Sequence, residues 1–241
     1  MNELAARIEF TRIELPVASE TLSELAAFYA DWGRVRAATP AAIELTVGPT
    51  VVAFTGSSEP SFHHFALQLP GDRFDAAQTW LAERAPLRSE PAQSEPTFHF
   101  ENIDAVASYV LDPAGNIVEL IAFPDLRRLG QAGPFDSREM LGVAEIGLVV
   151  LDRASANAAL STRGLETYSG SPQTERREFL QFVGERGRSI ILASPARRWL
   201  PTYRPAELSP AAIEMVIDDV PSALHLRNGR LTAELETRTA F

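Results

Sequence analysis

Hydrophobic and polar residues alternate along several short stretches of the chain, and segments with helical spacing follow some of them. Residues 62–70, Phe-His-His-Phe-Ala-Leu-Gln-Leu-Pro, have the period of two that is typical of a strand. Between Phe74 and Leu81 the apolar residues recur three and four positions apart, which predicts an amphipathic helix that runs to Glu83. Short strands are then expected at 97–101, 106–111 and 117–123. The predicted unit is therefore strand, helix, strand, strand, strand.

The same pattern recurs along the chain, which indicates an internal repeat. The first copy spans 7–56: its residues 8–30 resemble 62–83, with a helix over 17–30, and its strands follow at 42–47 and 50–54. Aligning Pro16 with Pro70 places Phe10 opposite His64. A third copy begins at Val143 and aligns Glu145 with His64; its helix is expected over 153–161 and later strands at 179–183 and 189–193. The strand signal at 213–217 opens a truncated or atypical fourth copy.

This order of elements predicts an α+β fold in two halves. We expect an N-terminal pair of modules over 1–123, consisting of 7–56 and 62–123, and a degenerate C-terminal pair over 139–241. The polar, Gly- and Pro-bearing segment 124–138 is expected to be the linker between them. Modules three and four are expected to be mainly structural, as a degenerate second cleft or a subunit interface.

Composition removes several chemistries. The net charge of −10 disfavours nucleic acid and anionic membranes as partners, because both need a basic surface. The chain has no Cys, and all 22 basic residues are Arg, so thiolate nucleophiles, Cys-bound zinc and Schiff-base lysines are excluded. Any metal would be held by His, carboxylate or water. The N-terminus lacks an apolar leader and no stretch has the length of a membrane helix, so a cytoplasmic protein is expected.

One motif carries a family resemblance. The segment Tyr-Val-Leu-Asp-Pro-Ala-Gly-Asn-Ile-Val-Glu-Leu-Ile-Ala at 109–122, with His-Phe-Ala-Leu-Gln-Leu-Pro at 64–70, resembles the vicinal oxygen chelate superfamily of glyoxalases, bleomycin resistance proteins and extradiol dioxygenases. The resemblance implies βαβββ modules that pair into U-shaped mixed sheets, whose concave face can hold a divalent metal. The ligands of such a metal come from the first and fourth strands of a module, which correspond here to His64 and Glu119.

Strand alternation supports His64 as a cleft residue, because His64, Ala66 and Gln68 share one face. Imidazole and carboxylate suit Fe, Mn, Zn, Ni or Co, each of which can act as a Lewis acid. The resemblance also implies a ligand from the first strand of the partner module, where this chain has the apolar Phe10. The alternative is therefore a metal-free pocket in which His64 and Glu119 form a hydrogen-bonded pair.

Other residues are candidates by position. If Phe98 and Phe100 pack under the helices, His99 points into the cleft as a general base or a further ligand; the alternative is an ordinary strand histidine. Tyr109 is a candidate hydrogen-bond donor to substrate, or else a packing residue.

Arg12 shares the face of Phe10, so both are assigned to substrate binding, with Arg12 clamping a carboxylate. An ion pair between Arg12 and Glu14 is the alternative. Residues 197–199, Arg-Arg-Trp, are expected to be a solvated surface cluster.

These observations favour an enzyme of the dioxygenase, lyase or isomerase type that acts on a small oxygenated metabolite with a divalent metal. The alternative is a metal-free protein that binds a small molecule or an antibiotic in the same cleft. The expected partner is a small molecule, and the expected assembly is a monomer or a homodimer.

Overall fold

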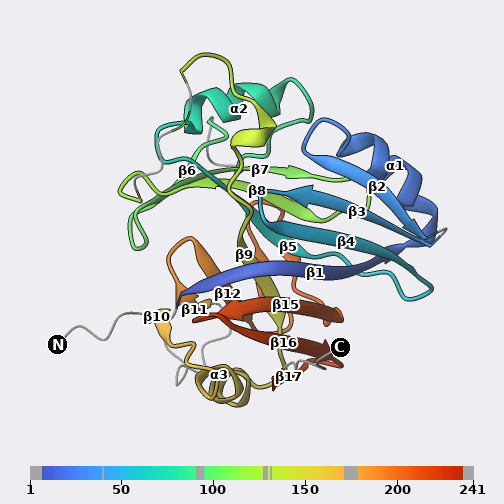
Figure 1. Ribbon diagram of the computed structural model, residues 1–241, viewed down its shortest axis with the longest axis vertical. Helices are drawn as coiled ribbons and strands as arrows, with labels where there is room; N and C mark the ends of the chain where they lie inside the picture. Colours follow the sequence, from blue (N-terminus) through green and yellow to red (C-terminus); the bar gives the residue numbers. More distant parts are fainter. Residues whose placement is uncertain are drawn as a thin grey trace.

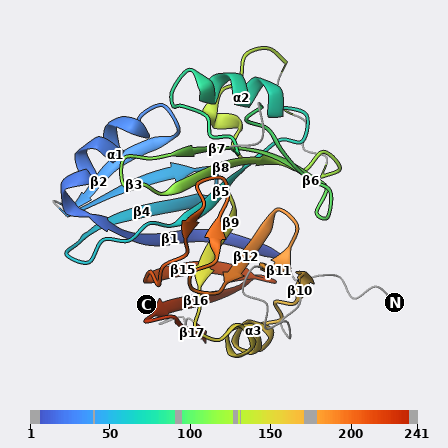
Figure 2. The ribbon, with the colours of Figure 1, turned by 180° about the vertical axis from the view of Figure 1, so that it is seen from behind.

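Two mixed β-sheets, a short hairpin and three α-helices make up the computed structural model, which describes residues 7–39, 41–90, 95–126, 130, 132–170 and 179–235 (Figures 1 and 2). The seven-stranded sheet has, in order, β17 (Arg230–Leu235), β16 (Val220–Arg227), β15 (Ala211–Ile217), β1 (Ile8–Ala18), β4 (Thr50–Ser57), β3 (Ala42–Val47) and β2 (Arg34–Thr39). The eight-stranded sheet has β10 (Thr167–Ser169), β11 (Gln181–Glu185), β12 (Arg188–Ala193), β9 (Val143–Val149), β5 (His64–Leu69), β8 (Ile117–Ala122), β7 (Ala105–Leu111) and β6 (Phe98–Phe100).

The remaining elements are short. The hairpin pairs β13 (Arg198–Trp199) with β14 (Arg204–Pro205), and the helices are α1 (Leu22–Phe28), α2 (Phe74–Ala82) and α3 (Arg153–Ser161). Two 3-10 turns, η1 (Ser19–Thr21) and η2 (Ser137–Glu139), complete the description. The α+β class and the repeated strand-helix-strand units predicted from the sequence are confirmed.

The element boundaries differ from the prediction where tertiary pairing overrides local pattern. The first helix begins at Leu22 instead of Val17, because β1 continues beside β4 until Ala18 meets Ser57. The fourth copy supplies three strands, β15 to β17, and no helix among the described residues. Parts of the expected linker, 127–129 and 131, lie outside the described residues.

The modules pair differently from the expected halves 1–123 and 139–241. β1 runs antiparallel beside β15, with Ile13 opposite Ile213, so module one shares a sheet with module four. β5 runs antiparallel beside β9, with Phe65 opposite Ile146, so module two shares a sheet with module three. Figure 1 shows this arrangement as the blue N-terminal strand lying next to a red C-terminal one.

The pairing of modules two and three is supported by backbone hydrogen bonds at the end of the linker. The backbone N–H of Leu141 donates to the carbonyl of Gln68, and the N–H of Gln68 donates to the carbonyl of Gly142. These bonds join the start of β9 to the end of β5, so β9 runs antiparallel beside β5. A repeat pattern alone fits either pairing, and the backbone bonds decide it.

One face of β5 packs into the main apolar core, and the opposite face carries His64. Phe65, Leu67 and Leu69 belong to the main apolar cluster, which collects buried residues from both sheets and all three helices. Each such side chain contributes about 1.5–3 kcal/mol when it leaves water. The alternate residues of β5, beginning with His64 and Ala66, face the opposite side of the sheet, as the period of two predicted.

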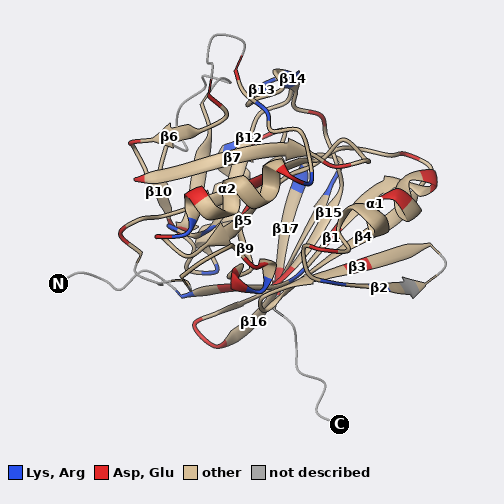
Figure 3. Cartoon of the chain, turned by 90° about the horizontal axis from the view of Figure 1, so that it is seen from above, with Lys and Arg blue, Asp and Glu red and all other residues tan. Residues whose placement is uncertain are grey.

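The surface carries charges of both signs. In Figure 3 acidic and basic residues are interspersed along strands, helices and loops. In the same part of the chain, no helix has both the length and the apolar character that crossing a bilayer requires.

Candidate functional site

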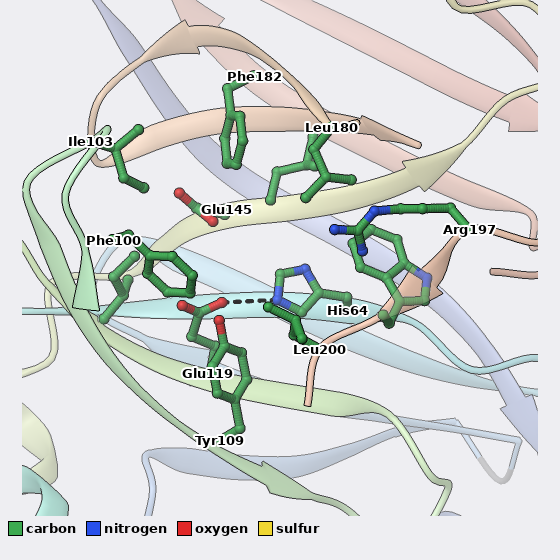
Figure 4. A pocket seen from close by; sticks show the side chains of 13 residues that line it. His64, Phe100, Ile103, Tyr109, Glu119, Glu145, Leu180, Phe182, Arg197 and Leu200 are labelled. Carbon is green, nitrogen blue, oxygen red and sulfur yellow. Dashed lines mark hydrogen bonds and ion pairs between the residues drawn. The ribbon is translucent and has the colours of Figure 1, made fainter. Parts of the chain in front are cut away.

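A cavity of about 60 Å³ lies on one face of the eight-stranded sheet (Figure 4). This is several times the roughly 10–15 Å³ that one water needs. Modules two and three and the β13–β14 hairpin all contribute to its wall. The polar lining side chains are His64, Tyr109, Glu119, Glu145 and Arg197, and the apolar ones are Phe100, Ile103, Ile121, Leu180, Phe182, Ile191, Trp199 and Leu200.

His64 and Glu119 meet at the floor of this cavity. The parallel register places His64 opposite Ile117 and Ala66 opposite Glu119, so both functional side chains project from the same face of adjacent strands. The Nε2 atom of His64 lies 2.9 Å from the Oε2 atom of Glu119, and both side chains are almost fully buried. The structure thus brings together the two residues that the motif singled out.

The turn before β8 fixes this register. Asp112 accepts hydrogen bonds from the backbone and side-chain nitrogens of Asn116, at 2.9 and 2.8 Å, while Gly115 has the positive φ of 79° that the turn requires. The side-chain oxygen of Asn116 accepts from the backbone N–H of His63 at 2.8 Å. Asn116 therefore joins the start of β8 to the start of β5, and this alignment sets Glu119 beside His64.

Glu145 is the third acidic or basic group at the floor, and it comes from module three. It lies on β9, directly opposite Ala66 in the antiparallel register. Its Oε1 atom is buried without a hydrogen-bond partner. Burial raises the pKa of Glu145 well above its ordinary value, and the negative charge of Glu119 raises it further.

Glu145 corrects the expectation that Phe10 lies across from His64. The sequence aligns Glu145 with His64, but the expected pairing of modules one and two places Phe10 across from His64. Phe10 is fully buried in the main core instead, and module three contributes Glu145, Leu180, Phe182 and Ile191 to the cavity wall. Module three was expected to be mainly structural, and the structure places four of its residues at the cavity.

Tyr109 lines the cavity beside Glu119. It lies opposite Glu119 in the β7–β8 register. Burial raises the pKa of Tyr109 well above 10, and the negative charge of Glu119 and a hydrogen bond to it act in the same direction. The phenol therefore stays protonated and donates to the carboxylate.

His99 lies away from the cavity. Phe98 and Phe100 face the cavity side of the sheet, where Phe98 packs against Tyr109 with 4.9 Å between ring centroids. Strand alternation consequently turns His99 to the other face, where it lines an open groove with Asp72 and Asp75 near the start of α2. The premise that Phe98 and Phe100 pack under the helices was wrong, and with it the placement of His99 in the cleft.

Arg12 also lies outside the cavity, on the other sheet. Its guanidinium group bonds Glu14 at 2.9 Å and Glu44 at 2.8 Å, and Glu44 is shared with Arg36. These ion pairs lower the pKa of Glu44, with the bond from Arg12 as the largest cause. Arg12 therefore forms the ion pair with Glu14 that was the alternative expectation. It does not line this cavity, as a substrate clamp would.

The β13–β14 hairpin supplies residues that the sequence analysis missed. Trp199 is buried and stacks on His64, with 5.1 Å between ring centroids and 22° between ring planes. Arg197 lies over Trp199, with its Cζ atom 5.2 Å from the ring centroid. The sequence presented these residues as a charged cluster in a loop, and only the fold shows that the loop turns back over the cavity.

The structure resembles solved structures of enzymes with this type of fold. Glyoxalase I from Zea mays aligns over 95% of this chain and 92% of its own, with a TM-score of 0.52 and 13% identity. A putative dioxygenase from Bacillus subtilis aligns over 93% and 83%, with a TM-score of 0.56 and 14% identity. Neither a protein-family model nor a curated protein sequence matches the chain. The chain therefore has the fold of the vicinal oxygen chelate superfamily.

The donor groups at the cavity floor fit a divalent metal ion by their chemistry. One imidazole and two carboxylates are ligands that such ions take, and the unpartnered Oε1 atom of Glu145 is a buried acceptor that a cation would satisfy. Within the described residues, no three His, Asp or Glu side chains form a ready metal-binding group. His64 and Glu119 bond each other instead, so an ion would have to replace that bond.

Proposed function

We propose that the protein is a divalent-metal-dependent enzyme whose substrate, a small oxygenated metabolite, binds in the cavity above His64, Glu119 and Glu145. The observation that supports this proposal is the approach of two buried carboxylates and an imidazole from three adjacent strands to one cavity. Two carboxylates in a buried site repel each other, and a divalent cation relieves that repulsion. When bound, the ion would act as a Lewis acid on substrate oxygens.

The surrounding residues would orient the substrate and limit water. Tyr109 is a protonated donor next to Glu119, suited to hold an oxygen of the substrate near the floor. Glu145 would hold the ion through Oε1, the buried oxygen that has no hydrogen-bond partner. The apolar wall, including Phe100, Phe182 and Trp199, excludes solvent and strengthens these interactions.

Metal binding tests the proposal directly. Metal-free protein would be titrated with Mn(II), Zn(II), Ni(II), Co(II) and, without oxygen, Fe(II), with calorimetry and the thermal midpoint as readouts. We expect one ion per chain. Glu119→Gln, Glu145→Gln and His64→Ala should each weaken binding by more than the roughly 10–100-fold that loss of a supporting hydrogen bond causes.

His99→Ala is the matched control, because His99 faces a different groove. It should bind the ion as the unmodified protein does. Absence of binding, or binding that survives both Glu119→Gln and Glu145→Gln, would overturn the proposal. Circular dichroism would verify that each variant is folded.

A second candidate function is metal-free binding of a small molecule. It is favoured by the direct bond of 2.9 Å between Nε2 of His64 and Oε2 of Glu119, which pairs these two atoms without an ion. The mainly apolar wall suits sequestration of an apolar compound. Tight binding of such a compound to protein that takes up no metal would select this candidate.

A further inference from the structure

The cavity is small for the ligand that the proposed function requires, so part of its wall has to move. Its volume is about 60 Å³, whereas sites that bind small molecules have roughly 300–1,000 Å³. The residues of its floor lie on β5, β8 and β9, which backbone hydrogen bonds join into the eight-stranded sheet. A shift of these strands would break that pairing. The movable part therefore belongs to the rest of the wall.

The β13–β14 hairpin, residues 196–206, forms part of the wall without belonging to either large sheet. Among the described strands, β13 and β14 pair only with each other. The backbone N–H of Tyr203 donates to the carbonyl of Trp199 at 2.7 Å, so this bond also stays inside the hairpin. Trp199 and Leu200 nevertheless line the cavity, and Figure 4 shows Leu200 beside His64. The hairpin can therefore move as a unit while both large sheets stay intact.

Arg204 joins this hairpin to the body of the protein. Its Nη1 atom donates to the carbonyl of Gly115 at 2.8 Å, and its Cζ atom lies 3.6 Å from the centroid of the Phe62 ring. Gly115 belongs to the turn before β8, and Phe62 is a buried residue just before β5. One side chain thus makes a charged hydrogen bond and a cation–π contact with the segments that lead into the two floor strands.

The same side chain sets the position of Trp199. Arg204 lies directly opposite Trp199 in the register of the hairpin. Trp199 in turn stacks on His64, with 5.1 Å between ring centroids. The contacts of Arg204 with Gly115 and Phe62 therefore keep the indole ring against the imidazole ring.

We propose that the hairpin is the wall that moves to admit the ligand, and that Arg204 is a positioning residue that holds the hairpin closed over His64. Movement of a short segment that covers a site commonly controls when ligands enter and leave. What enters the cavity rests on the proposed function, whereas the movement itself needs neither metal nor substrate and is measured without them.

Thiol labelling measures the movement, because the chain has no Cys and an introduced Cys is the only thiol. Ile121 is buried and lines the cavity, so iodoacetamide reaches the thiol of Ile121→Cys only when the wall opens. Val118→Cys is the matched reporter, because Val118 lies on the same strand and packs in the main core. We expect Ile121→Cys to react faster than Val118→Cys.

The dependence on urea separates local movement from unfolding. Movement of the hairpin exposes little surface, so labelling of Ile121→Cys should hardly change at low urea concentrations. Labelling of Val118→Cys requires the core to unfold and should rise steeply with urea. Ile191→Cys, on β12, repeats the measurement from another strand of the cavity, and circular dichroism verifies that each variant is folded.

Substitutions of Arg204 test its role. Arg204→Ala should speed labelling of Ile121→Cys by about 10–100-fold, which corresponds to the loss of a hydrogen bond that involves a charged group. Arg204→Lys keeps a donor for Gly115 but lacks the planar group over Phe62, so its labelling rate should lie between those of Arg204→Ala and the unmodified hairpin.

Arg198→Ala is the matched control. Arg198 also donates to a backbone carbonyl, that of Tyr203 at 3.0 Å, but this bond stays inside the hairpin, so the labelling rate should not change. Equal effects of Arg198→Ala and Arg204→Ala would overturn the role of Arg204, as would a rate that Arg204→Ala leaves unaltered. Equal rates and equal urea dependence of Ile121→Cys and Val118→Cys would overturn the moving hairpin, because the cavity would then open only by unfolding.

Discussion

Trp199 lies nearly flat against the imidazole ring of His64, 5.1 Å from centroid to centroid. The Nδ1 atom of His64 is buried without a hydrogen-bond partner. Histidines that bind metals usually have their second nitrogen held by a carboxylate or carbonyl group. At His64 no such group is present among the described residues; the ring stacks on Trp199 instead, with Nε2 directed at Glu119.

Gly147 makes room for this contact. A Cβ atom at residue 147 would lie 2.8 Å from a carbon of the Trp199 ring and 3.3 Å from Nδ1 of His64. We expect Gly147→Ala to lower the free energy of unfolding by about 1–3 kcal/mol, because the indole ring has to shift. Urea denaturation measures this loss.

A double-mutant cycle isolates the contact. In a Trp199→Leu background the indole ring is absent, so Gly147→Ala should cost clearly less than in the unmodified protein. An equal cost in both backgrounds would show that the clash does not involve Trp199.

Arg186 stabilises the segment around Ile103, on one side of the cavity. Its side chain donates to the carbonyl of Ile103 at 2.9 Å and bonds both carboxylate oxygens of Asp125, at 2.8 and 2.6 Å. Because Ile103 lines the cavity, we expect Arg186→Ala to lower the free energy of unfolding by about 1–2 kcal/mol and to speed amide hydrogen exchange at Ile103.

Arg138 offers the control for Arg186. It also bonds a carboxylate at 2.6 Å, that of Asp136, but its side chain is 88% exposed. Arg138→Ala should therefore change the free energy of unfolding by only about 0.5 kcal/mol and leave exchange at Ile103 unaltered. Similar effects of the two substitutions would contradict the role given to Arg186.

His63 should destabilise the fold in acid. Burial lowers the pKa of His63 from 6.5 to about 4, against a smaller opposing effect of its hydrogen bond to the carbonyl of Pro16. Between pH 6.5 and pH 4 the unfolded chain takes up a proton that the folded protein refuses. The free energy of unfolding should thus fall by roughly 3 kcal/mol as the pH decreases through this window. Denaturation of His63→Gln at pH 4 to 7 should lack this contribution.

Asp112 should act with the opposite sign. Burial raises its pKa from 3.8 to about 6, although bonds from Asn116 and Tyr29 oppose the shift. As the pH rises from about 4 to 6, the unfolded chain loses this proton first, so the free energy of unfolding should decrease by roughly 3 kcal/mol. Asp112→Asn imitates the protonated side chain and should remove the decrease. If this variant follows the pH curve of the unmodified protein, the assignment to Asp112 is wrong.

Much of the fold could be predicted from the sequence because its elements are encoded locally. The alternation in 64–69 separates the two faces of β5, which are both buried, and the three- and four-residue spacing of 74–82 reflects the buried side of α2. The Asp112 to Asn116 turn was readable because Gly and Asn suit positive φ. The pairing of the modules could not be predicted from the sequence, because the first strand of any other module would fit the edge of β5 equally well.

The same distinction explains the candidate site. His64 and Glu119 belong to one module, so a local motif identified both. Glu145 depends on which module lies across the sheet, and Trp199 depends on a loop that returns over the cavity, so neither follows from a local pattern. The predicted placement of His99 was wrong for a local reason, since a three-residue strand has too few positions to fix which face is inside.

The pairing of β1 with β15 also governs how the chain is assembled during synthesis. Ile8 lies opposite Ile217, so β1 cannot pair with β15 until the chain has been made as far as Ile217. The strands of modules two and three can pair earlier, where the backbone bonds of Leu141 and Gly142 join β9 to β5. The strands at the cavity floor can therefore pair before β15 joins β1 and completes the seven-stranded sheet.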